Sequence, residues 1–252
     1  MDNKDIILGL DVSTACIGCC LLIDDGSEFG KIIELTHIVP KVPKKNKGIE
    51  SLFMRDKFFT NDFLMKWKDF GITRVVIESP LLNSNNVYTV ETLIKFNGMI
   101  SESVYDVLGI VPEYISSYDA RKYAFPKLLS IRKFDKKGNE YPKSKIMSSI
   151  KKGNFVLFGA FPWDVDKKSV LQSNVAEAFP DIDWLYGKNG ELRKENFDAS
   201  DAYVACYGFL NKEKHGELEM KVSDIQEKDD EITYTVEYWN TKETRHMKLH
   251  EK

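Results

Sequence analysis

Four acidic residues stand out because their positions could bring carboxylates together. Asp11 lies inside the apolar stretch Ile6–Ile23, and Glu78 ends a later apolar run, TRVVIE. Asp198 and Asp201 are three residues apart, so a helix there would place both carboxylates on one face. Like charges this close repel each other unless a cation lies between them. Carboxylate oxygens are the ligands that Mg²⁺ and Mn²⁺ prefer.

Such a site would have a definite chemistry. Two divalent ions ~3.5–4 Å apart can activate a water and stabilise the leaving oxygen of a phosphodiester. We therefore expect two Mg²⁺ or Mn²⁺ ions per active site as the cofactor. Each acid also has a plainer interpretation. Asp198 could cap a helix, Glu78 could be a satisfied acid at a strand end, and Asp11 could cap a turn.

The elements that must position these acids follow from hydrophobic periodicity and turn residues. We predict these strands: Ile6–Val12, Cys16–Ile23, Lys31–Val39, Thr73–Glu78 and Ile110–Ser116. We predict these helices: Ile49–Phe70, Val87–Leu108, Asp166–Phe179 and Asp198–Leu210.

The order of these elements predicts the fold class. Three strands in close succession indicate an antiparallel meander, and the helix between the fourth and fifth strands indicates a parallel βαβ addition. The sequence therefore predicts an α/β fold with a five-stranded mixed sheet flanked by helices. If the first and fourth strands are parallel neighbours, Asp11 and Glu78 emerge close together.

Charge is unevenly distributed along the chain. The 252 residues carry a formal net charge of only −3, yet Arg121–Lys152 alone carries about +9. Such a block is either a solvated loop or an anion-binding surface. We predict a nuclease domain over residues 1–212 with a basic insertion at about 118–165. Residues 213–252 would form an acidic extension, a β-hairpin of Met220–Ile225 and Ile232–Trp239 that packs on the core.

Five segments, in order along Ile6 to Leu210, resemble one known family. They are GLDVSTACIGCCLL, IESP, GIVPEYIS, VDKKSVLQSNV and FDASDAYVAC. They are similar to segments of the RuvC-type Holliday junction resolvases, which belong to the RNase H-like (retroviral integrase) superfamily. The Asp-Lys-x-x-Val segment followed by Asp-Ala-x-Asp-Ala is the most specific part. The resemblance implies an RNase H-like fold.

The resemblance also implies an activity and a set of site residues. It implies a Mg²⁺-dependent endodeoxyribonuclease that cuts Holliday junctions and other branched DNA, acts as a homodimer and needs no nucleotide cofactor. The family's metal ligands fall on Asp11, Glu78, Asp198 and Asp201. Its active-site lysine falls on Lys167, with Lys168 as the second register, and a further basic residue falls on Lys122 or Arg121. The cleavage would leave a 5′-phosphate and a 3′-hydroxyl.

Other basic and polar side chains could hold DNA around the cut. The candidate DNA-binding residues are Arg121, Lys122, Arg132, Lys133, Lys168, Lys44, Lys45, Asn83 and Asn85. The exposed side of the helix Val87–Leu108 is the candidate dimer interface. Phe96 and Met99 lie off the core stripe of that helix and could belong either to the interface or to the core.

Three alternatives compete with a junction resolvase. The four acids do not encode the shape of the substrate, so a flap, debranching or single-strand nuclease of the same fold would fit them equally. A non-catalytic DNA-binding protein would gain nothing from four intact acids. An actin-like sugar kinase shares the first strands, but it needs a second subdomain and glycine-rich phosphate loops that this chain is too short to hold.

The cysteines and the apolar pattern bear on location. Cys16 and Cys19 form a CxxC without a second pair or nearby histidines, so we expect buried thiols and no zinc site. The first residues, MDNKD, do not have the pattern of a secretory leader, and no apolar run reaches the ~20 residues that a membrane helix needs. We expect a cytoplasmic protein without a membrane segment. The richness in Lys, Asn and Ile suggests an AT-rich genome, that of a phage or of a low-GC bacterium. For a phage protein, the location would be the host cytoplasm.

Overall fold

The structure, a computed structural model, describes residues 5–43, 45–80, 86–193 and 195–249. The chain folds into two compact units, each described by itself below. The first unit consists of Met1–Ala120 and Lys168–Phe209, and the second consists of Arg121–Lys167 and Leu210–Lys252. The predicted boundary at residue 212 separates the insertion from the C-terminal extension, whereas the structure groups these two segments in one unit.

A five-stranded sheet forms the centre of the first unit. Its strands are β1 (Ile6–Val12), β2 (Ile17–Ile23), β3 (Lys31–Ile38), β4 (Arg74–Glu78) and β5 (Glu113–Ile115). The order across the sheet is β3-β2-β1-β4-β5. β1 is antiparallel to β2 and parallel to β4, and β5 is parallel to β4. The predicted α/β class and the five-stranded mixed sheet are therefore confirmed.

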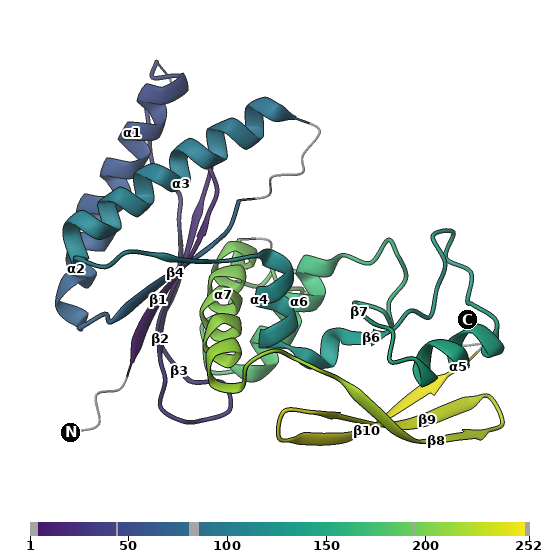
Figure 1. Cartoon of the computed structure of the whole chain (residues 1–252). Coiled ribbons are helices and arrows are strands. Elements are labelled where there is room, and N and C mark those ends of the chain that lie inside the picture. Colours follow the sequence, from purple (N-terminus) through teal and green to yellow (C-terminus); the bar gives the residue numbers. More distant parts are fainter. Residues whose placement is uncertain (1–4, 44, 81–85, 194, 250–252) are drawn as a thin grey trace. The chain divides into compact units, whose positions relative to one another are not determined.

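One face of the sheet packs against helices that follow β3 and β4. These helices are α1 (Gly48–Phe59), α2 (Met65–Trp67) and α3 (Val87–Leu108). Because side chains alternate along a strand, Leu8 and Leu10 of β1 point to this face. They join one buried cluster with Trp67 and Phe96. Figure 1 shows α1 and α3 on the opposite side of the sheet from α7.

The other face of the sheet packs against α7 (Asn196–His215). Ala202, Tyr203 and Cys206 of this helix are fully buried. A Cβ atom at Gly9 would overlap the Ala202 carbonyl, and one at Gly18 would overlap the backbone of Asp198. The helix backbone thus lies almost directly on β1 and β2, at two positions where only glycine leaves room.

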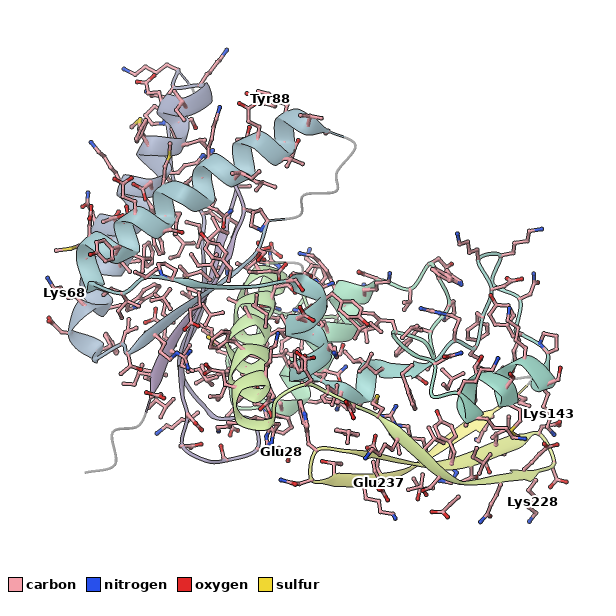
Figure 2. The ribbon with its side chains drawn as sticks, in the orientation of Figure 1. Glu28, Lys68, Tyr88, Lys143, Lys228 and Glu237 are labelled. Atoms are coloured by element: carbon pink, nitrogen blue, oxygen red, sulfur yellow. The ribbon has the colours of Figure 1, made fainter. Side chains whose placement is uncertain are left out.

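One predicted helix differs from the structure in detail, whereas the helix predicted over Val87–Leu108 has the same bounds as α3. The helix predicted over residues 49–70 is segmented, because η1 (Thr60–Leu64), a π-helical turn, follows α1, and η2 (Lys68–Phe70), a 3₁₀ turn, follows α2. It ends at Gly71 in a left-handed conformation (φ 72°), which glycine adopts without strain. On α3, Phe96 is buried and Met99 packs against the same core. Both belong to the core, and the exposed side of α3 instead carries Tyr88 (Figure 2).

The basic insertion is folded and forms part of the second unit. Its elements are the latter part of α4 (Ser117–Ala124), η3 (Pro126–Leu128), β6 (Leu129–Ile131), α5 (Lys143–Lys151) and β7 (Phe155–Leu157). Ile131, Ile146 and Ile150 join a buried cluster with Ile232 and Tyr234 of the C-terminal segment. On the surface, Lys143, which is labelled in Figure 2, pairs with Glu227 at 2.6 Å.

The C-terminal segment forms three strands rather than the predicted hairpin of two. They are β8 (Lys221–Lys228), β9 (Glu231–Tyr238) and β10 (Thr241–Lys248), with β9 in the centre. The sequence of β10, TKETRHMK, contains a single apolar residue, so periodicity gives no signal for this strand. Its pairing with β9 and the burial of Met247 decide its conformation.

The glycine contacts under α7 give a stability prediction. We expect Gly18→Ala to lower the free energy of unfolding by about 1–3 kcal/mol, because the added methyl forces the first turn of α7 away from the sheet. Gly98→Ala is the matched control. Gly98 lies in α3 and nothing lies within 4 Å of an added Cβ, so the substitution should stabilise by about 0.5–1 kcal/mol. Urea denaturation measures both changes, and equal effects would contradict the close approach.

Candidate active site

Asp11 and Glu78 lie at the carboxyl ends of two neighbouring parallel strands. In the register of β1 and β4, Leu10 is opposite Ile77, so the next residues along the two strands are Asp11 and Glu78. Leu10 and Ile77 both point into the core on the α1 and α3 side. By alternation, Asp11 and Glu78 therefore point to the face that α7 covers.

The first turns of α7 carry the other two acids over this edge of the sheet. Gly18 pairs directly with Asp11 across β1 and β2, and it also lies beneath the Asp198 backbone. The contact therefore fixes the start of α7 next to Asp11. Asp201, one turn further on, is 3% exposed. The charges of Glu78, Asp201 and Asp198 all act on Asp11.

Lys168 brings a positive charge to these carboxylates. It lies in the first turn of α6 (Lys167–Ala178), and its ammonium is 3.0 Å from Oδ2 of Asp201. Burial alone would lower the pKa of Lys168, but the charges of Asp201, Asp11 and Asp198 outweigh it, and the pKa is raised. The resemblance favoured Lys167 as the active-site lysine, with Lys168 as the second choice. In the structure Lys167 is exposed, and the lysine that lies beside the acids is Lys168.

The electrostatics of Asp11 show how crowded the site is. Burial is the largest cause that raises the pKa of Asp11 well above its usual value, and the charges of Glu78, Asp201 and Asp198 raise it further. Lys168 acts in the opposite direction. A group whose pKa is raised by several like charges favours a bound cation or a proton at neutral pH.

Cys16 is a neighbour of the site that the sequence did not single out. Burial raises the pKa of its thiol to about 12, and the hydrogen bond and charge of Asp198 raise it as well. A thiol with this pKa stays protonated near neutral pH. All four cysteines are free and buried, as predicted. Cys16 therefore packs against Asp198 as a neutral donor.

A pocket of about 700 Å³ lies beside Asp198. It is lined by residues of the β1–β2 turn, β3 and the segment before α7: Ala15, Cys16, His37, Val39, Glu191, Leu192, Arg193, Glu195 and Asp198. Within it, Arg193 pairs with Glu195. The sequence did not predict His37 and Arg193 as pocket residues. Neither lies in a motif, and only the fold brings them together.

The donor set has the chemistry of a magnesium or manganese site. Four carboxylates supply only hard oxygen ligands, and neutralising their repulsion requires positive charge. In the described part of the chain, no group of three or more His, Cys, Asp or Glu side chains is arranged to hold a metal ion. Instead, the ammonium of Lys168 compensates part of the negative charge. The residue types fit a divalent cation, and the cation would have to draw the side chains together.

The predicted DNA-binding residues fall in different surroundings. Lys44, Asn83 and Asn85 lie outside the described residues, whereas Lys45 is exposed. The guanidinium of Arg132 donates to the carbonyls of Leu157, Phe158 and Phe161 and stacks on Trp163 at 4.5 Å. This arginine holds a loop of the second unit together.

The remaining basic candidates lie in the second unit. Lys122 lies 3.7 Å from Glu217 and over the ring of Tyr123. Arg121 is partly exposed, and Lys133 is almost fully buried. DNA binding by any of these residues stays a prediction.

The strand order and directions, with helices on both faces, define the fold class as RNase H-like. No protein-family model matches the chain, and no curated protein matches it. Among the described residues, no helix has the length and apolar character needed to cross a membrane.

Solved structures similar to this chain include three of resolvases. The chain is 11% identical to Thermus thermophilus RuvC, with a TM-score of 0.45 and 84% and 96% of the two chains covered. The chain is 9% identical to T. thermophilus RuvC in complex with Holliday junction substrate, with a TM-score of 0.48. The match covers 84% of this chain and 96% of that one. The chain is 13% identical to the yeast mitochondrial Holliday junction resolvase Ydc2, with a TM-score of 0.43. The match covers 82% of this chain and 78% of that one. Since these TM-scores are below 0.5, we draw the chemistry from the side chains themselves.

The crowding of Asp11 predicts a stability change. We expect Asp11→Asn to raise the free energy of unfolding by on the order of 1 kcal/mol at pH 7–8 in EDTA, because the amide removes a buried charge among like charges. The folded-state pKa of Asp11 is raised, so the wild type loses stability as the pH rises through the interval between its unfolded and folded values. The gain should vanish below about pH 3, where Asp11 is protonated in both states. Thermal melts across pH measure it, and a less stable variant at neutral pH would contradict the crowded geometry.

Proposed function

We propose that this protein is a divalent-metal-dependent endodeoxyribonuclease that hydrolyses phosphodiesters in branched DNA, with Holliday junctions as its substrate. One observation carries the hydrolytic part. Asp11 lies under the combined charge of Glu78, Asp198 and Asp201, which come from separate elements, with Lys168 beside them. Such a concentration of acids has no structural benefit and is costly without a cation.

Each residue of the site has a proposed task. Asp11, which feels the charges of the other three acids, would hold metal together with Glu78, Asp198 and Asp201. Bound Mg²⁺ or Mn²⁺ supplies an activated water and neutralises charge on the leaving oxygen. Lys168 would stabilise the negative charge that develops on the scissile phosphate.

The choice of branched DNA depends on the sequence motifs rather than on the four acids. The VDKKSVLQSNV and FDASDAYVAC segments resemble those of junction resolvases. We propose that a nucleotide next to the cut occupies the pocket beside Asp198. Because a resolvase cuts two symmetric strands, we propose that the chain acts as a homodimer with two active sites. A flap or debranching nuclease of the same fold is the alternative.

A cleavage assay with a synthetic four-way junction tests the proposal. The wild type should cut the junction with Mg²⁺ or Mn²⁺ and leave 5′-phosphate ends. Asp11→Asn, which keeps the shape but removes a charge, should lower the rate by at least about 10²-fold, the upper range for disturbing the surroundings of a metal ligand. Gly98→Ala serves as a control remote from the acids. A fully active Asp11→Asn variant, or a wild type without metal-dependent cleavage, would overturn the assignment.

A panel of DNA shapes separates the junction substrate from its alternatives. Linear duplex, flap, Y-shaped and four-way substrates with the same arm sequences should be cut at different rates, with the four-way junction fastest. Symmetric cuts in opposing strands are expected from a dimer. Equal rates on linear duplex and junction would reject a resolvase, and a preference for the flap would favour the alternative nuclease.

The two adjacent lysines give a sharp test of the active-site register. We expect Lys168→Gln to lower kcat by roughly 10²-fold with little change in KM, since its charge acts on the transition state. Lys167→Gln should lose much less, because the ammonium 3.0 Å from Asp201 belongs to Lys168. Single-turnover cleavage of the junction measures both. The reverse order of effects would restore Lys167 as the active-site lysine.

A further inference from the structure

A groove of about 550 Å³ lies within the second unit, outside the candidate active site, and one of its lining residues, Lys133, is a candidate DNA-binding residue from the sequence. The basic insertion and the C-terminal strands line it together. Its lining residues are Lys127, Ser130, Lys133, Ala160, Tyr234, Glu243, Arg245, His246, Met247 and Lys248. The acidic C-terminal segment therefore contributes basic side chains to this one place.

The groove is strongly positive. Four Lys and Arg residues and a histidine line it against a single acid, Glu243. Glu243 is already bound, because Nη2 of Arg245 lies 2.6 Å from its carboxylate and Nε donates to the same oxygen. Glu243 therefore does not balance the charges of Lys127 and Lys133, which line the same groove.

Lys133 is the most informative member of this set. Lys133 is only 8% exposed, and its ammonium lies over the ring of Phe134, 5.3 Å from the ring centroid. Among the described residues, no carboxylate forms an ion pair with it. Its backbone is fixed on both sides, since its N–H donates to Gly159 and its carbonyl accepts from Tyr141. A buried cation held in place without a counter-charge is costly, and an anion in the groove would offset that cost.

Hydrogen bonds within the protein hold the lining of the groove in place. Arg245 on β10 donates to the backbone carbonyls of Leu129 and Pro126, which ties the C-terminal sheet to the insertion. Tyr234, which is 1% exposed, lies in the same lining. Such fixed side chains lose little freedom when a ligand binds.

We propose that this groove binds the sugar–phosphate backbone of a DNA arm. The inference rests on the proposed function for the identity of the nucleic acid, and it adds a second site of contact. The volume exceeds what a single phosphate needs. The cations come from separate segments, so they can meet successive phosphates along a strand. Ala160, which is exposed, supplies apolar surface for a sugar.

Binding of a labelled four-way junction in EDTA, followed by fluorescence anisotropy at several salt concentrations, tests this site. Lys133→Gln and Lys127→Gln should each weaken binding roughly fivefold near physiological salt and reduce the slope of log K against log salt by about 0.9. Lys221→Gln is the matched control, since Lys221 is an exposed lysine of β8 outside the lining. It should leave both the affinity and the slope unchanged.

Two measures keep the test decisive. Lys127 is exposed, so its substitution should not affect folding, and circular dichroism checks that the buried Lys133→Gln variant keeps the wild-type fold. An excess of inorganic phosphate should compete only weakly with the junction. Wild-type affinity and slope in the Lys127→Gln variant would overturn the proposal. So would strong competition by phosphate, which would indicate a small-anion site.

The outcome is separate from that of the nuclease proposal. The binding assay leaves Asp11, Glu78, Asp198 and Asp201 intact and uses no metal. Loss of affinity in the lysine variants of a protein that cuts no junction would support the groove and reject the nuclease. Normal binding by these variants in a protein that cuts junctions would reject the groove alone.

Discussion

The direct contact between the backbone of α7 and the strands β1 and β2 is the constraint on which the site depends. Gly9 and Gly18 remove two side chains from that face of the sheet, and the helix comes to rest on their backbone. The same contact places Asp198 above the residue that pairs with Asp11. A helix held at the usual distance by side chains would leave the two aspartates of α7 farther from the strand-end acids.

That closeness has an electrostatic cost, which the site meets with Lys168. Burial raises the pKa of Asp11, and the charges of the three other carboxylates raise it further. The charge of Lys168 lowers it in part. Lys168 is itself held in the charged form by the same acids. The arrangement is a set of hard oxygen donors with one ammonium among them, and a divalent cation would have to draw these side chains together.

The second unit shows how a basic insertion and an acidic C-terminal segment become one structure. Ile146 and Ile150 of α5 share a buried cluster with Ile232 and Tyr234 of β9. The surface above this cluster collects lysines from both segments, although their net charges are opposite in sign. The basic and acidic segments that are separate in the sequence therefore do not form separate basic and acidic regions on the folded surface.

The sequence by itself determined the five-stranded mixed sheet, and it singled out the four acids as candidates. The three-residue spacing of Asp198 and Asp201 predicted that both lie on one side of a helix, because helical periodicity is a local property of the backbone. Only the tertiary structure decided that Lys168 reaches Asp201, that Phe96 belongs to the core, that TKETRHMK forms a strand, and that Lys133 is buried beside a groove. These outcomes depend on contacts between segments far apart in the chain, for which a local pattern carries no signal.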